Sequence, residues 1–143
     1  MAKFIGRNVR VKVGSTELTD HIASVEVTET VDEIEVTALG SAARQRISGL
    51  KDASVTISFH QDYDASSVNA TLAGVFGGTS TVTVLAGTAL TQGTAAANSP
   101  LYTIPVLCSQ QSLISAQTGD LSTFDITWPA TGEITKSTAG TFV

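Results

Sequence analysis

One helix-like segment interrupts a chain that otherwise has the pattern of strands and turns, and this interruption constrains the fold more than any other feature of the sequence. Polar residues that can cap a helix N-terminus occupy positions 62–67. An apolar stripe at helical spacing follows them, formed by Val68, Leu72, Val75 and Phe76. Gly77-Gly78 can end the helix, because glycine tolerates a positive φ. The pattern predicts a helix over about residues 65–77.

Strand-like patterns flank this helix on both sides. Residues 55–59 alternate apolar and polar side chains, which is typical of a half-buried strand, and residues 81–85 have β-type composition. The length of 143 residues suits one domain that can bury a core without disulfides or metals. We therefore predict a mainly β fold, a β-sandwich flanked by one helix, with residues 1–143 as a single domain.

The chain carries fewer charged residues than ordinary soluble domains do. Only 15% of its residues are Asp, Glu, Lys or Arg, against about 25% in ordinary soluble domains. Such a surface favours a subunit that hides much of itself against other subunits. The alternative is a weakly charged, Thr/Ser-rich secreted domain.

Net charge and cysteine usage exclude several classes of function. The formal net charge is −5, which disfavours nucleic-acid binding through phosphate neutralisation. No apolar run approaches the ~18 residues of a membrane span. The N-terminus lacks the apolar core of a secretory signal. Cys108 is the one cysteine, so no intrachain disulfide forms, and it is expected to be a small buried hydrophobe in a reducing cytosol.

Two hairpins are expected in the first forty residues. Gly14-Ser15 has the composition of a two-residue turn after the strand 9–13, with Leu18 returning opposite Val11. A second hairpin is expected from residues 22–30 and 33–39 around Val31-Asp32. Its pairing would place an acidic, hydroxyl-rich face opposite an apolar one. The acids of that face include Glu26, Glu33 and Glu35.

Basic residues concentrate in two other places. Residues 40–50 form a polar connection, long enough to contact something outside the domain, which holds Arg44 and Arg46. The N-terminal segment holds Lys3, Arg7, Arg10 and Lys12. This segment could pair with the acidic hairpin within one fold, or it could steer one subunit onto another.

Candidate chemistry is sparse. His60, Asp62 and Asp64 have metal-ligating side chains, but they precede a helix, where carboxylates stabilise the N-terminus. Neither a nucleophile elbow nor a phosphate-binding glycine loop is present, and Cys108 in mid-strand is a poor nucleophile. We expect no enzymatic activity, no catalytic or metal site, and no cofactor.

Several segments, in their order and spacing, resemble the tail tube (major tail) proteins of long-tailed bacteriophages. The resemblance covers about residues 17–137. It is carried by Asp32-Glu33-Ile34-Glu35-Val36-Thr37-Ala38-Leu39-Gly40 with Arg44 and Arg46, by Gly49-Leu50-Lys51-Asp52-Ala53-Ser54-Val55-Thr56, by Gln61-Asp62-Tyr63-Asp64, and by Gly119-Asp120-Leu121, Phe124, Trp128-Pro129 and Gly132.

This resemblance implies a structural virion protein. Subunits of that family close into rings, expected here to be hexameric, and the rings stack into a hollow tube through which the genome is ejected. The inner sheets would join into a barrel across subunits, which removes open strand edges. The implied partners are further copies of the chain, tape measure, tail tip and tail terminator proteins, and passing DNA that is not bound sequence-specifically. The location would be the virion tail, after synthesis and assembly in the bacterial cytoplasm, without membrane association.

Specific residues can be assigned to these expected surfaces. Glu26, Glu33 and Glu35 are candidates for an acidic lumen that repels phosphates, unless their face is simply the solvated outside of the sandwich. Candidate inter-subunit contacts are loop 40–50, both terminal segments, and the basic residues Lys3, Arg7, Arg10, Lys12, Arg44 and Arg46. The alternative function is a capsid decoration protein or adhesin-like β-sandwich binding module.

Overall fold

The structure is a computed structural model that describes residues 9–64, 67–86, 100–116 and 118–138. Strands dominate these residues, and one α-helix and one short 3-10 helix accompany them. In chain order the elements are β1 (Val9–Val13), β2 (Thr16–Glu17), η1 (Thr19–His21), β3 (Ile22–Glu35), β4 (Arg46–His60), α1 (Val68–Val75), β5 (Thr79–Ala86), β6 (Leu101–Leu107), β7 (Thr123–Pro129) and β8 (Thr135–Ser137).

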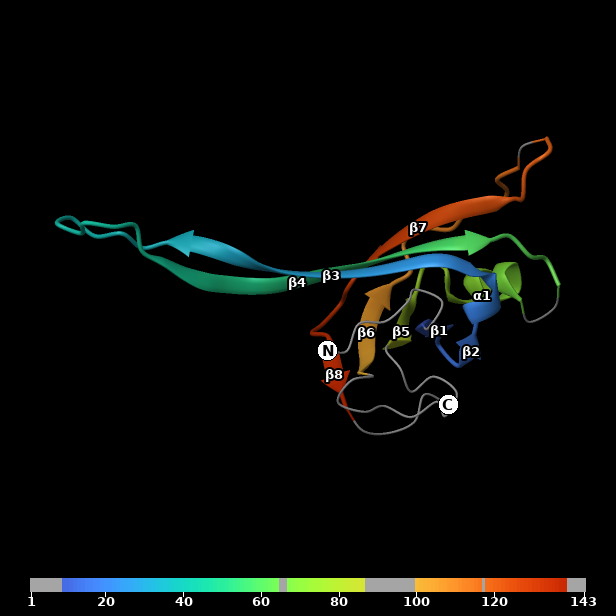
Figure 1. The fold of residues 1–143 in the computed structure, drawn as a ribbon, viewed down its shortest axis with the longest axis horizontal. Helices are drawn as coiled ribbons and strands as arrows, with labels where there is room; N and C mark the ends of the chain where they lie inside the picture. Colours follow the sequence, from blue (N-terminus) through green and yellow to red (C-terminus); the bar gives the residue numbers. More distant parts are fainter. Residues whose placement is uncertain (1–8, 65–66, 87–99, 117, 139–143) are drawn as a thin grey trace, which may run out of the picture.

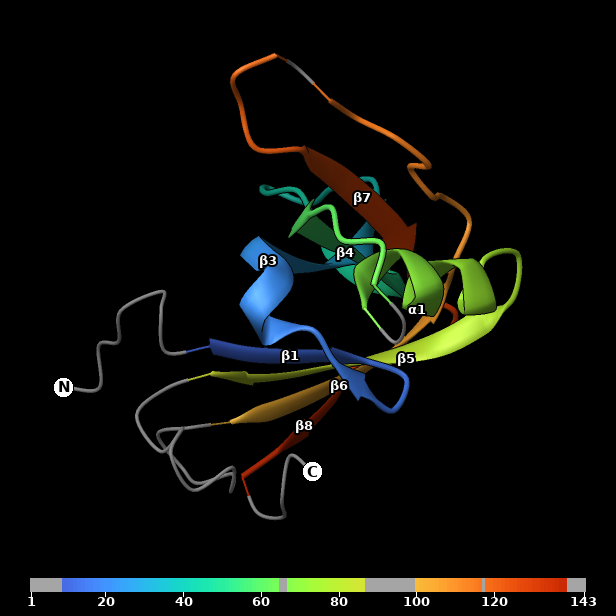
Figure 2. The same ribbon diagram turned by 90° about the vertical axis from the view of Figure 1, so that its right-hand side faces the viewer.

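Two antiparallel sheets face each other across one apolar core (Figure 2). The first sheet has the order β2-β1-β5-β6-β8, and the second has the order β3-β4-β7. Alternation along the strands sends every second side chain inward. The largest buried side chains come from both sheets, with Trp128, Phe59 and Ile57 from the second and Ile104 from the first. The mainly β fold expected from the sequence is confirmed.

The N-terminal hairpin forms as predicted. Val13 pairs with Thr16 across Gly14-Ser15, and Gly14 has the positive φ of 63° that such a turn requires. The Leu18 N–H donates to the Val11 carbonyl at 3.1 Å, so these two residues lie opposite each other.

The flanking helix is confirmed, but it is shorter than predicted. It runs from Val68 to Val75, and its buried residues are Val68 and Leu72. Residues 65–66 of the predicted range lie outside the described residues. Ser67 occupies the N-cap without a capping side-chain hydrogen bond. Phe76, predicted to belong to the buried stripe, is instead an exposed C-cap residue, because the backbone leaves the helix there before Gly77 turns with φ 84°.

The predicted hairpin around Val31-Asp32 is wrong. β3 runs unbroken through these residues and pairs with β4 along its length, from Ile22 opposite Phe59 to Glu35 opposite Arg46. The β-branched Val31 disfavours the positive φ that the tight hairpin turns need at their first central residue. The chain reverses further on, over residues 36–45, where Gly40 has φ 88°. The predicted loop 40–50 is therefore corrected as well, because residues 46–50 belong to β4.

The long β3–β4 hairpin projects far beyond the body of the molecule (Figure 1). We call its projecting part, residues 30–51, the arm. We call residues 36–45 at its end the tip. Val36 and Gln45 close the tip, because the Val36 N–H donates to the Gln45 carbonyl at 2.8 Å.

Candidate assembly surfaces

The arm exposes apolar side chains that nothing in the described structure covers. Every arm residue is exposed except Gly49, which is half-buried. An isolated two-stranded hairpin is at best marginally stable in water, and exposed apolar groups of this kind mark interaction sites. The arm is therefore a candidate association surface. Its large exposed apolar residues are Val31, Ile34, Val36, Leu39, Ile47 and Leu50.

A β-bulge sets the direction of the arm near its base. Between the pairs Val31–Lys51 and Glu33–Ser48, β3 contributes only Asp32, whereas β4 contributes Gly49 and Leu50. The extra residue bends and twists a strand locally. Packing at the bulge favours glycine, because a Cβ on Gly49 would lie 3.0 Å from the Asp32 Cβ and 3.1 Å from the Ile34 Cδ1, and these neighbours would have to shift by a few tenths of an ångström.

The three predicted lumen acids do not share a face. They were placed together through the hairpin around Val31-Asp32, whereas alternation along the continuous β3 puts Glu26 on one face and Glu33 and Glu35 on the other. Glu26 lies over the body of the molecule, opposite Thr56. Glu33 lies on the arm and forms an ion pair with Arg46.

The outward face of the β3-β4-β7 sheet carries hydroxyl groups and a few carboxylates. We call it the hydroxyl face. Neighbouring side chains on this face bond to one another. The Thr56 and Thr127 Oγ1 atoms lie 3.2 Å apart across β4 and β7, and along β3 the Thr28 Oγ1 donates to the Glu26 Oε1 at 3.3 Å. The register brings Asp125 onto the same face, opposite Ser58. Its members are Ser24, Glu26, Thr28, Ser54, Thr56, Ser58, Asp125 and Thr127, among which there is no basic residue.

β3 and β7 are the two edges of this sheet. On β7, the Thr127 N–H points away from β4, because it donates to the Gln110 Oε1 at 3.0 Å. Antiparallel strands direct alternate residues to the same side, so the Asp125 N–H also points outward. Gln110 satisfies the Thr127 N–H, whereas no described residue accepts from the Asp125 N–H, and an unpaired edge group of this kind invites another strand.

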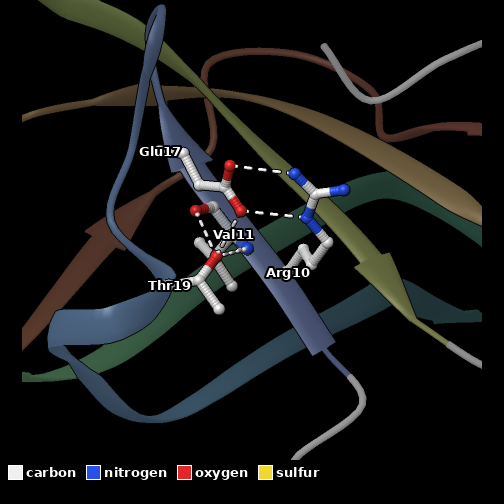
Figure 3. Close-up of polar contacts among 4 residues, drawn as sticks. All are labelled: Arg10, Val11, Glu17 and Thr19. Carbon is white, nitrogen blue, oxygen red and sulfur yellow. Dashed lines mark hydrogen bonds and ion pairs between the residues drawn. The ribbon is translucent and has the colours of Figure 1, made fainter. Parts of the chain in front are cut away.

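The predicted basic contacts are only partly described. Lys3 and Arg7 lie outside the described residues. Arg10 donates from Nε and Nη2 to the two carboxylate oxygens of Glu17, both at 2.9 Å (Figure 3). Lys12 stands opposite Glu17 in the same hairpin. Within the described residues, Arg10 therefore pairs inside the fold, as one of the two predicted alternatives has it. Its partner is Glu17 and not an acid of β3.

The Arg10–Glu17 pair ties the N-terminal hairpin together. Hydrogen bonds from Arg10, aided by Thr19, hold the pKa of the Glu17 carboxyl below its ordinary value. A lowered folded-state pKa adds stability above the unfolded-state value and loses it as the pH falls through the folded-state value. Because both side chains are partly exposed, we assign the pair less than about 1 kcal/mol.

The other side chains considered for chemistry, Asp62 with its neighbours and Cys108, take part in local structure. Asp62 accepts a hydrogen bond from the Asp64 N–H at 2.9 Å and lies 3.6 Å from His21. The described residues contain no group of three His, Cys, Asp or Glu side chains that could hold a metal ion. Cys108 is buried, and burial raises the pKa of its thiol. In the described part of the chain, no helix has the length and apolar character needed to cross a membrane.

Two solved structures share this fold over nearly their whole length. One belongs to the virion of a native gene transfer agent (GTA) particle, with a TM-score of 0.70, 12% identity, and coverage of 94% of this chain and 99% of that chain. The other belongs to the tail of an empty GTA particle with C6 symmetry, with a TM-score of 0.67, 13% identity and the same coverage. No model of a known protein family and no curated protein matches the sequence. These neighbours confirm the expected fold, which this chain shares with a chain of a GTA virion and a chain of a GTA tail.

Sequence reasoning missed the arm and the contribution of Asp125. The alternation over residues 55–60 predicts a strand there, but it does not indicate which strand pairs with it. A signal was present, because the sequence offers Gly40 as a turn residue and places similar numbers of strand-forming residues on either side of it.

Proposed function

We propose that this chain is a structural subunit of a tail tube, in which six copies form a ring and the rings stack into a channel for genome ejection. The observation that carries the proposal is the full-length fold shared with a chain from a sixfold-symmetric tail. The low charge content and the exposed apolar arm support it, because both suit a subunit that is covered on several sides.

In this proposal, the sheet β3-β4-β7 joins its counterparts edge to edge. β3 of one copy would pair with β7 of the next, so that each ring closes a barrel and leaves no open edge in that sheet. The arm, with Arg44 and Arg46, and the terminal segments, with Lys3 and Arg7, would make the other contacts between copies. Arg10 and Lys12 would support the terminal segment from the hairpin they share with Glu17.

The hydroxyl face lines the channel in this arrangement. Its acids, Glu26 and Asp125, repel phosphates, and hydroxyl groups give passing DNA no fixed cationic partner. Glu33 and Glu35 belong to the arm and are not included in this lumen. The further partners would be tape measure, tail tip and tail terminator proteins, and the location would be the virion tail after assembly in the host cytoplasm.

Assembly of the purified protein tests the function directly. We expect negative-stain microscopy to show rings or tubes, and light scattering after size exclusion to show masses at multiples of the 14.8 kDa chain. A capsid decoration or adhesin-like module would give small, featureless particles. A protein that stays monomeric at high concentration, also when mixed with tail initiator components, would contradict the proposal.

Reversing the charge of the hydroxyl face tests the lumen. We expect Glu26→Lys combined with Asp125→Lys to leave tubes intact and to reduce DNA delivery by at least tenfold, because lysines hold phosphates that should slide past. The measurement is infectivity or transduction per assembled particle. The matched control is Glu33→Lys with Glu35→Lys on the arm, scored for delivery in the particles that do assemble. Normal delivery by the Glu26/Asp125 variant would place the lumen elsewhere.

A further inference from the structure

The tip of the arm presents one apolar and one cationic side chain to solvent. Leu39 is fully exposed, at 106% of its reference area. Arg44 is the one charged residue in the tip sequence 36–45, and it makes no ion pair with the residues that the structure describes. The turn between them is built from small residues, with the Ser41 N–H donating to the Ala38 carbonyl at 3.2 Å. The tip therefore offers a partner one exposed apolar side chain, Leu39, with the positive charge of Arg44 in the same turn.

A groove with the complementary character lies at the other end of the arm. We call it the root groove. It has a volume of about 520 Å³ and lies between the base of the β3–β4 hairpin and residues 130–133. Small apolar residues, Ala53 and Ala130, line it together with Gly132. Leu50 also lines it while remaining 80% exposed, so the groove leaves apolar surface uncovered.

The lining of the root groove has an excess of negative charge. Glu29, Asp52 and Glu133 supply three carboxylates, and Lys51 supplies one ammonium group, which leaves a formal charge of −2 (three minus one). Lys51 donates to the Glu133 Oε1 at 2.7 Å, and the Asp52 Oδ1 accepts the Ala53 N–H at 2.8 Å. Within the described residues, the Glu29 carboxylate accepts no hydrogen bond, and only the charge of Lys51 acts on it. Glu29 is therefore the first candidate to meet an incoming cation.

The tip cannot reach the root groove of its own chain. The strands of the arm separate them by about 20 Å, since six residues of extended strand span roughly 3.3 Å each, and the tip lies at the end of the arm that is far from the body of the molecule (Figure 1). Any contact between tip and groove must therefore join two copies. Because tip and groove are different surfaces, each copy can give one contact and receive one, which makes the contact head-to-tail and repeatable.

We propose that the tip of one copy docks into the root groove of a second copy, with Leu39 against Leu50 and Arg44 beside Glu29. This inference rests on the proposed function, because it takes the partner to be another subunit of the tube. The apolar hollow beside β1, lined by Val9, Val11, Ile22 and Val25, is a poorer acceptor, since none of its described lining residues is a carboxylate that could pair with Arg44. Apolar burial supplies affinity here, and charge complementarity fixes the register.

A charge swap tests the docking. We expect Arg44→Glu or Glu29→Arg to raise the concentration needed for assembly by about tenfold or more, because each places like charges in contact. The combined variant, Arg44→Glu with Glu29→Arg, should recover most of the loss. Lys136→Glu and Asp120→Arg are matched controls that reverse charges outside tip and groove. Assembly by Arg44→Glu at the wild-type concentration, or a double variant no better than the singles, would overturn the docking.

Cross-linking gives a second test that does not depend on the shape of the assembly. A Leu39→Cys chain is co-expressed with a Thr131→Cys chain and treated with a short bismaleimide, and the expected product is a dimer of one chain of each kind. Leu39→Cys with Thr123→Cys, at the exposed start of β7 and outside the root groove, should give none. Wild-type tubes without the Leu39–Thr131 product would refute the docking and leave the proposed function standing. Wild-type monomers without that product would refute both.

Discussion

Asp125→Pro is expected to abolish ring formation while leaving the subunit folded. The Asp125 N–H points away from β4, like that of Thr127, so its loss removes no hydrogen bond within the described sheet. Proline is tolerated at a sheet edge for this reason. At a joint between subunits, the same substitution removes one strand-pairing bond, worth about 1 kcal/mol, and places the proline ring where the neighbouring strand would lie. A closed ring repeats the defect at every joint.

The measurement combines thermal unfolding with size-exclusion light scattering. We expect a midpoint within a few degrees of the wild type, a monomeric mass, and no rings by negative stain. Asp125→Asn is the matched control, because it removes the same charge but keeps the backbone N–H, and it should assemble. Rings formed by a folded Asp125→Pro variant would show that the β7 edge is not a subunit joint.

The core and the helix could be predicted because local patterns determine them. Alternation placed Phe124, Ile126 and Trp128 inward, and all three are buried. The spacing of Val68 and Leu72 located the helix. Such patterns depend on one sheet face or one helix face meeting a core, and they can be recognised without knowing which strand lies next to which.

The arm could not be predicted in the same way, because it has no core to meet. Its residues are exposed on both faces, so burial does not fix their register. Local alternation allowed a reversal at Val31-Asp32 as readily as one ten residues later. The position of the reversal is set by the long pairing of β3 with β4, which extends from Ile22–Phe59 to Glu35–Arg46. The predicted turn put Glu26 and Glu33 on one face, and without that turn they lie on opposite faces of β3. The hydroxyl face depends on the pairing of β7 with β4, which local sequence patterns do not indicate.

Replacing the arm with a tight turn should separate folding from assembly. Residues 32–50 are exchanged for Asn-Gly, so that Val31 and Lys51, which already face each other, flank a two-residue hairpin turn. The removed residues include no member of the buried core, and the deletion also removes the bulge at Gly49. We therefore expect a soluble monomer whose midpoint of unfolding changes by no more than a few degrees.

The assembly of this variant should fail completely, because it loses all the large exposed apolar residues of the arm except Val31, together with Arg44 and Arg46. The measurement is negative stain with sedimentation, at concentrations where the wild type is expected to form tubes. The matched control keeps the arm and substitutes Ser41→Ala and Ala42→Ser in the tip, which alters the sequence but neither length nor charge. Tubes built by the armless chain would show that the sheet edges suffice for assembly. The arm would then have to serve something other than contact between copies.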